Sequence, residues 1–244
     1  MTIRSRQPII IGTRFRGPPR SGNGGYTAGL LGRIFDRSAE VTLLAPPPLR
    51  LPLIVEKTGD DVTLWSSQKR IATAKPAPVD IQVPPAPTLV EANAASSKAI
   101  KVEDHLFPEC FVCGPNRCEG DGLRIFSGLD VSEKFAAAVW QPSREFTDET
   151  GYIAPEIIWA SLDCPSYFGL MKPGLIALLG QFAVEIFHRP VADQTCIISA
   201  WPIREAGTKH IAGSALYDAS GRPLARARAV WIELQGATED QKNT

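Results

Sequence analysis

Short runs rich in apolar and β-branched residues fill the second half of the chain, and turn-forming residues separate them. This composition is typical of antiparallel strands. The expected strands are Phe182–Phe187, Thr195–Ile203, His210–Tyr217 and Leu224–Leu234. The segment Ile157–Leu162 is instead apolar on nearly all sides, and Pro155 suits a first helical turn, so a buried helix is expected over Pro155–Phe168. A second helix is expected over Tyr26–Phe35, after a glycine-rich stretch.

Two segments of the first half recur in the same order in the second half. Val41-Thr42-Leu43, with Pro47 after it, resembles Val184-Glu185-Ile186, with Pro190 after it. Further along, residues 67–74 resemble residues 220–227, and each is a turn followed by the start of a strand. Either match alone would be weak, but the shared order predicts an internal repeat.

A proline- and alanine-rich stretch separates the two copies. It lacks apolar periodicity, which favours a linker that is extended at its start and flexible later. We therefore expect an N-terminal repeat over 8–84, a linker over 85–104 and a C-terminal repeat over 105–236. With one helix and several antiparallel strands in each repeat, the predicted fold class is α+β, with each sheet wrapped around one central helix.

Composition narrows the function classes. The chain has 244 residues, 44% of them hydrophobic, and 26 basic residues balance 26 acidic ones. A chain without net charge gives no support to nucleic-acid binding. No stretch reaches the ~20 apolar residues of a membrane span. Five cysteines, an odd number, do not suggest a disulfide framework. The expectation is a reduced, cytoplasmic protein that binds neither nucleic acid nor membrane.

Three motifs carry a resemblance to a known superfamily. They are Cys110-Phe111-Val112-Cys113-Gly114 with the following Gly120–Phe126, Asn23-Gly24-Gly25, and Leu162-Asp163. Together they resemble the hotdog-fold acyl-CoA thioesterases, nearest to the phenylacetate-pathway branch. The resemblance implies a tandem double hotdog that forms a pseudo-dimer and hydrolyses an acyl-CoA without a cofactor. Whether such pseudo-dimers pair further stays open.

The resemblance also assigns the candidate catalytic residues. In the family, a glycine pair opens the central helix, an acid follows nine residues later, and each site combines the opening of one unit with the acid of the other. Here nine residues after Asn23 is Gly32, and nine before Asp163 is Ala154. The first repeat therefore keeps the opening and the second keeps the acid. This implies one composite site made of Asn23, Gly24, Gly25 and Asp163.

The residue types suit acyl transfer. A helix N-terminus offers free N–H groups and a positive dipole, which can hold a thioester oxygen as it gains charge. Asp163 would act as general base or nucleophile, while Asn23 could orient the carbonyl or the water. The alternative is structural: Gly24 and Gly25 could serve a tight turn, Asn23 a helix cap and Asp163 a hydrogen-bonded core carboxylate.

Two further features concern possible ligands. Cys110, Cys113 and Cys118 have spacing that suits zinc, but only His105 or Cys164 offered a fourth ligand, so no metal is expected. Arg189 follows a predicted strand, and the resemblance implies that it could contact a CoA phosphate.

Two rival functions stay open. One is a catalytically inactive acyl-CoA-binding or assembly protein of the same fold, because Asn23 stands where the family has histidine. The other is an enoyl-CoA hydratase, which would need a histidine near a helix opening. The acyl group itself is not predicted, because its pocket would draw on several strands. An acyl-carrier-protein thioester is a less favoured substrate.

Overall fold

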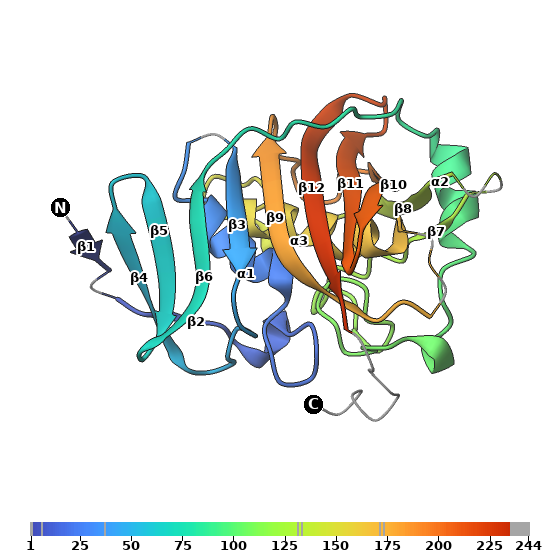
Figure 1. Cartoon of the computed structure of the whole chain (residues 1–244). Coiled ribbons are helices and arrows are strands. Elements are labelled where there is room, and N and C mark those ends of the chain that lie inside the picture. The colour runs from blue at the N-terminus through green and yellow to red at the C-terminus, as the bar shows by residue number, and fades with distance from the viewer. Residues whose placement is uncertain are drawn as a thin grey trace.

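The computed structural model describes residues 2–5, 7–36, 38–130, 132, 134–170, 172 and 174–234. These residues form one antiparallel sheet of twelve strands in the order β1-β4-β5-β6-β3-β9-β12-β11-β10-β8-β7, with β2 beside β4 (Figure 1). The strands are β1 Thr2–Arg4, β2 Ile9–Ile10, β3 Ala39–Leu43, β4 Pro52–Thr58, β5 Asp61–Ser66, β6 Lys69–Pro76, β7 Gly128–Leu129, β8 Ala136–Trp140, β9 Ala177–Ile186, β10 Cys196–Ala206, β11 Lys209–Asp218 and β12 Pro223–Glu233.

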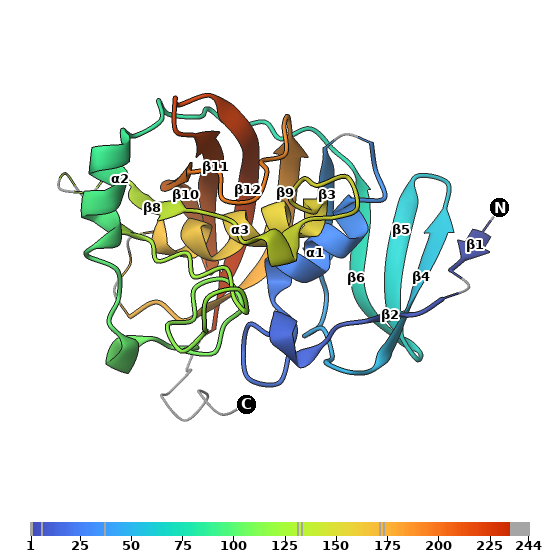
Figure 2. The ribbon, with the colours of Figure 1, turned by 180° about the vertical axis from the view of Figure 1, so that it is seen from behind.

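Two helices, α1 (Gly24–Gly32) and α3 (Pro155–Phe168), lie side by side behind the middle of this sheet, and α2 (Leu89–Ser96) covers one end (Figures 1 and 2). Three short 3-10 helices complete the regular structure of the described residues: Thr13–Phe15, Val102–Asp104 and Arg144–Phe146. The expected α+β class is confirmed, and the expected helix over 155–168 has those bounds. The helix expected from Tyr26 begins two residues earlier, because Asn23 caps it.

The two sequence echoes occupy matching places in the sheet. Val41 of β3 pairs with Ala74 of β6, and Val184 of β9 pairs with Ala227 of β12. At the centre, β3 and β9 pair with each other, with Val41 opposite Phe182. The similar strands β3 and β9 are therefore neighbours at the centre of the sheet. On their outer sides they pair with β6 and β12, which carry the second pair of similar segments.

Glycines on α1 allow it to lie very close to α3. A Cβ atom at Gly29 would lie 2.6 Å from the Glu156 Cα atom, and one at Gly32 would overlap the Trp159 ring. Gly25 meets Asp163 in the same way. These glycines are spaced four and three residues apart, so they share one face of α1. That face brings the backbone of the first half against the side chains of the second.

The stretch expected to be a linker is more ordered than its composition suggested. Residues 89–96 form α2, whose start has a capping box: Thr88 Oγ1 accepts from the Glu91 N–H, and Glu91 accepts from the Thr88 N–H. The expectation of a flexible second part was therefore wrong. The helix packs through Ala92 and Ala95, which are fully buried. Because these buried positions are alanines and not large apolar residues, the sequence shows no clear apolar face. The end of the expected second repeat, at 235–236, lies outside the described residues.

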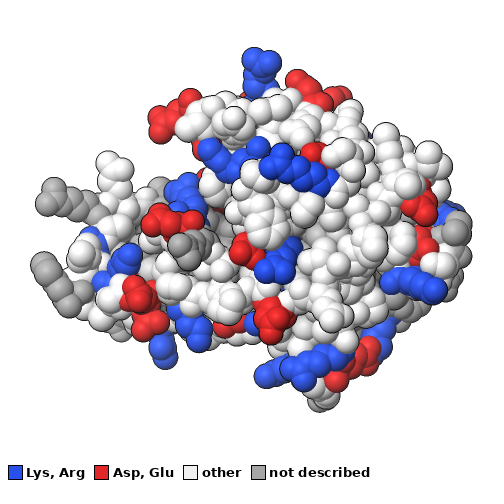
Figure 3. All heavy atoms as spheres, turned by 90° about the horizontal axis from the view of Figure 1, so that it is seen from above, with Lys and Arg blue, Asp and Glu red and all other residues white. Residues whose placement is uncertain are grey.

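In the described part of the chain, no helix combines the length and the apolar character needed to cross a bilayer. Figure 3 shows acidic and basic side chains interspersed over the face that it presents, as a chain without net charge would suggest.

Candidate active site

The start of α1 is organised by Asn23. Its side-chain Oδ1 accepts a hydrogen bond from the Tyr26 N–H at 2.8 Å, and its own N–H donates to the Phe15 carbonyl. Asparagine is among the best residues for this position, because the side chain satisfies an N–H that has no partner within the helix. Gly24 and Gly25 follow as the first two helical residues.

Asp163 of α3 meets this helix start. Its Oδ2 atom accepts from the Gly25 N–H and from Asn23 Nδ2, each at 2.8 Å, although these residues are 138 and 140 positions away in the chain. Asn23 therefore caps α1 with its oxygen and binds Asp163 with its nitrogen. Three of the four predicted site residues are in direct contact, and Gly24 lies between two of them.

The Asp163 carboxyl group is deeply buried, with 2% of the residue exposed. Burial raises its pKa to about 7, and the nearby Cys110 sulfur adds to this rise, while the Gly25 N–H and the Asn23 amide oppose it. The Oδ1 atom has no hydrogen-bond partner. The Oδ2 atom is thus fixed by two hydrogen bonds, whereas the Oδ1 atom accepts none.

The two glycines fit different neighbours. A Cβ atom at Gly25 would overlap the Asp163 Cβ atom, so the contact between helix start and carboxylate depends on glycine there. A Cβ atom at Gly24 would lie 3.0 Å from Leu179 and 3.2 Å from Leu43. Gly24 therefore faces an apolar region, whereas Gly25 faces the acid.

That apolar region is a cavity of about 770 Å³. Arg20 is the one charged residue among its described lining residues, and Gly24 forms part of its wall. Its apolar lining comes from Leu43, Leu44, Phe107, Ile176, Leu179 and Ile232, among others. Asp163 is not among the lining residues, but it bonds to Gly25, the residue directly after Gly24.

The start of α3 has a different structure. Ala154 precedes it without any side-chain cap, and Pro155 is its first residue. Glu156 pairs with Arg33 at 2.7 Å. The Trp159 ring fills the space beside Gly32. Among the described residues, no carboxylate bonds to this helix start as Asp163 does to α1, because the facing helix has Gly32 at the corresponding place.

Arg189 lies near this second helix start and not near Asp163. It lines a hollow of about 480 Å³ together with Gly32 and Pro155. Its guanidinium group forms an ion pair with Asp148 and donates to Thr150 Oγ1. The implied contact with a CoA phosphate stays a prediction, but the structure does not bring Arg189 together with the other candidate residues.

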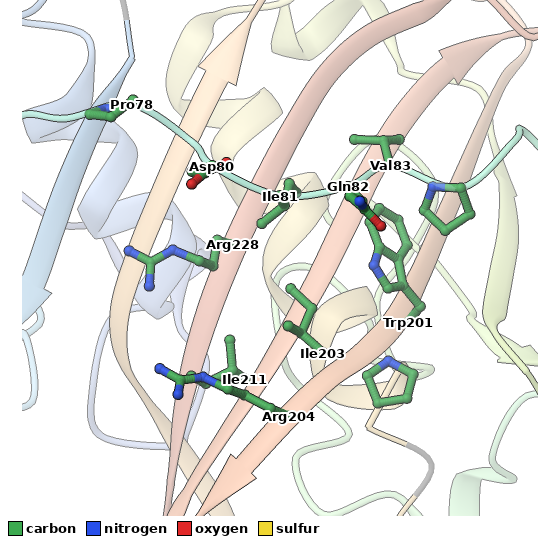
Figure 4. Close-up of a pocket in the computed structure, with 12 residues that line it drawn as sticks. Pro78, Asp80, Ile81, Gln82, Val83, Trp201, Ile203, Arg204, Ile211 and Arg228 are labelled. Atoms are coloured by element: carbon green, nitrogen blue, oxygen red, sulfur yellow. The ribbon is translucent and has the colours of Figure 1, made fainter.

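A third hollow, of about 850 Å³, lies where the chain after β6 crosses the sheet (Figure 4). Pro78–Pro84 form one side, and Trp201, Arg204 and Arg228 lie on the strands below. Arg228 pairs with Glu40 there. None of the predicted site residues lines this hollow.

The cysteines group differently from the sequence-based expectation. Cys118 is exposed, whereas Cys164 joins Cys110 and Cys113 in a buried cluster. Sequence spacing identifies Cys110 and Cys113 as a pair, but Cys164 lies on α3, and no local pattern connects it to them. These three sulfurs are the set of described residues best suited to hold a metal.

Comparisons with known proteins agree with this fold. No protein-family profile and no curated protein sequence matches the chain. Among solved structures, it is similar to the tesB protein of Mycobacterium avium subsp. paratuberculosis (TM-score 0.58, 13% identity, covering 96% of this chain and 93% of that one). It is also similar to a candidate thioesterase of Novosphingobium aromaticivorans (TM-score 0.61, 13% identity, 93% and 94%). A candidate thioesterase II of Thermobifida fusca is a third (TM-score 0.58, 14% identity, 88% of each chain). The expected resemblance to hotdog-fold thioesterases is thereby confirmed for the fold.

Proposed function

We propose that this chain is an acyl-CoA thioesterase with a single composite site between two hotdog repeats. The observation that carries the proposal is the meeting of Asn23 and Gly25 with Asp163, each at 2.8 Å, beside an apolar cavity. The three residues come from different halves of the chain, as a site shared between two repeats requires. The similar solved structures agree, since their names describe thioesterases.

Two repeats, near 8–84 and 105–236, are supported by the sheet registers. The pairing of Val41 with Ala74 corresponds to the pairing of Val184 with Ala227. Between β3 and β9, Ala39 lies opposite Val184 and Val41 opposite Phe182, which is the pattern that a two-fold axis between equivalent strands would produce. The helices agree, since α1 begins directly after Asn23 and α3 directly after Ala154.

The cavity supports a thioester substrate. Its apolar wall suits an acyl chain, because apolar surface removed from water contributes ~25 cal/mol per Å². Gly24 is the first residue of α1, and its N–H has no acceptor within the helix. That N–H would hold the thioester oxygen as negative charge develops on it. The 3′-phosphate or pyrophosphate of CoA would lie near Arg20, the charged residue of the lining.

Asp163 would supply the proton chemistry. As general base it takes a proton from water, the hydroxide adds to the carbonyl carbon, and the carbon–sulfur bond breaks to release CoA as a thiol. Alternatively, the carboxylate attacks the carbonyl carbon, the carbon–sulfur bond breaks to release the CoA thiolate, and water hydrolyses the resulting mixed anhydride to free the acid and restore Asp163. Because Asp163 is not among the cavity's lining residues, either course requires a path between cavity and carboxylate to open when substrate binds.

One observation favours a second candidate function, an acyl-CoA-binding protein without catalysis. Asp163 is 2% exposed, and its Oδ2 is already occupied by two donors. A carboxylate in that setting could serve only to fix α1 against α3. The cavity would then bind the acyl group, and no bond would break.

Turnover by the wild-type protein separates these functions. A panel of short, long and aromatic acyl-CoA esters is assayed for free-thiol release, and binding of the same esters is measured by calorimetry. The thioesterase proposal expects catalytic thiol release from at least one ester. Binding of an ester without release would favour the second function, and neither binding nor release would contradict both.

A further inference from the structure

The cysteine cluster has no part in the proposed reaction, although it lies next to the candidate site. Cys110, Cys113 and Cys164 are 3%, 6% and 9% exposed. Their three sulfur atoms lie within 4.8 Å of one another, and the Cys110 and Cys164 sulfurs are 3.6 Å apart. None of the three forms a disulfide. The cluster joins the segment after the second 3-10 helix to α3, on the helix side of the sheet.

The turn that carries two of these cysteines is held in one shape. The Gly114 N–H donates to the Cys110 carbonyl at 2.9 Å, and a Cβ atom at Gly114 would overlap that same oxygen. Between them, Phe111 is fully buried, and its N–H and carbonyl bond to the backbones of Arg16 and Leu123. The cysteine side chains therefore need no rearrangement of this turn in order to converge.

Three buried thiols that converge offer the ligand type that zinc prefers. In the contact between the Cys110 and Cys164 sulfurs, either atom could be the donor. Thiolates, not thiols, bind metals, so an ion that entered the cluster would displace protons from these cysteines.

The spacing of the sulfurs suits a zinc ion. With Zn–S bonds of ~2.3 Å in a tetrahedron, ligand sulfurs lie ~3.8 Å apart. The observed 3.6 Å and the upper limit of 4.8 Å enclose that value. We propose that Cys110, Cys113 and Cys164 form a structural thiolate site for Zn²⁺, which fastens the cysteine-bearing turn to α3 beside Asp163. This proposal departs from the sequence-based expectation of no metal, which rested on the lack of a convincing fourth ligand beside Cys110, Cys113 and Cys118.

A tetrahedral ion leaves one further position for a nitrogen or oxygen ligand. One buried atom of the kind that zinc accepts, His105 Nε2, has no hydrogen-bond partner and belongs to a residue five positions before Cys110. It lies outside the group of ligand atoms within 4.8 Å of one another, so it would have to move toward the sulfurs to complete the tetrahedron. His105 also lies against Phe168, with ring centroids 6.3 Å apart. Phe168 is one helical turn beyond Cys164, so this histidine approaches the face of α3 that carries the third cysteine.

Metal binding is tested on the full-length protein, purified under reducing conditions without chelator. We expect ~1 zinc per chain. After chelator treatment, Co²⁺ titration should produce the thiolate-to-metal absorption of tetrahedral cobalt, and added Zn²⁺ should raise the melting temperature. Cys113→Ser and Cys164→Ser should weaken Co²⁺ binding by at least the ~10–100-fold that loss of an outer-shell partner costs.

Two variants serve as matched controls. Cys118→Ser changes an exposed cysteine of the same segment, and Cys196→Ser changes a buried cysteine outside the cluster. Both should bind Co²⁺ like the wild type. If a cluster variant fails to fold, the melting shift of the wild type still decides. The proposal is wrong if the reduced wild type binds neither ion, or if Cys113→Ser keeps the full thiolate absorption. Neither readout depends on thioester hydrolysis.

Discussion

The helices α1 and α3 begin directly after Asn23 and Ala154, two positions that the proposed repeat makes equivalent, and the residues at the two helix starts differ in chemistry. At α1, an asparagine cap and two glycines leave room for a carboxylate from the opposite helix, and Asp163 occupies that room. At α3, Ala154 provides no side-chain cap and Pro155 is the first helical residue. The residue of α1 that faces α3 there is Gly32, which has no carboxylate. The space beside Gly32 is filled by the Trp159 ring.

Under the proposed repeat, this difference would mean that one of two equivalent places lacks a site although both keep a helix start. The α1 start has a buried polar contact beside a mostly apolar cavity, whereas the α3 start has a partly exposed ion pair between Arg33 and Glu156 beside a smaller hollow. Packing at the second place removes the need for a buried acid, which would be costly without partners.

The largest effect is expected from forcing the two places to be alike. Gly32→Asp introduces an acid that would face the α3 start, as Asp163 faces the α1 start, but the Trp159 ring already occupies the space beside residue 32. Overpacking and an unpaired buried carboxylate together should cost ~4 kcal/mol or more of unfolding free energy. Urea denaturation measures it. A stable variant with an added second activity would show that the α3 start had only lost its acid.

A smaller loss is expected from Gly25→Ala. The new methyl group overlaps Asp163, so the helices must separate or the carboxylate must move. We expect ~1–3 kcal/mol lower stability, together with reduced thiol release. Gly12→Ala is the matched control, since nothing lies within 4 Å of a Cβ atom there and its φ of −69° suits alanine. Equal losses in both variants would mean that the close contact has no special role.

Two substitutions reverse the capping of the two helices, by removing the cap of α1 and adding one to α3. Asn23→Ala removes a cap that also binds Asp163 and should cost ~1–2 kcal/mol. Ala154→Ser adds a cap where none exists and should gain ~0.5–1 kcal/mol. Thermal unfolding of both variants measures the difference. A destabilised Ala154→Ser would show that the second helix start is limited by packing and not by its missing cap.

The smallest effect is expected at Glu156. Its partner Arg33 has a side chain that is 44% exposed, which limits the ion pair to ~0–1 kcal/mol, and because the Glu156 side chain is only 13% exposed, a neutral amide there costs less to bury than a carboxylate. Glu156→Gln should therefore change stability little and leave thiol release unchanged. A marked fall in hydrolysis would assign a function to the α3 start and remove the contrast between the two places.

The sequence predicted the parts of this arrangement that depend on local chemistry. The apolar helix over 155–168 and the four strands of the second half follow from their residue types, and the order of the two echoes matched the pairing of β3 with β6 and of β9 with β12. The asparagine cap and the glycine pair were visible because helix starts need particular residues. The β4–β5 hairpin was not predicted, although Gly59 at its turn was a usable signal.

Other features depend on tertiary contacts, which no local pattern encodes. The place of Cys164 in the cluster and of Arg189 beside Asp148 could not be predicted, because each depends on how distant segments meet. The helix α2 was missed for a different reason: its buried positions are alanines, which composition alone attributes to a linker.

The central claim is that Asp163 performs the chemistry of one composite site. Asp163→Asn tests it most directly, because an asparagine oxygen can still accept from the Gly25 N–H and from Asn23. Thiol release and ester binding are measured together on the best substrate of the wild type. The account predicts a kcat at least ~100-fold lower, with ester binding little changed. A variant that retains full kcat would contradict it.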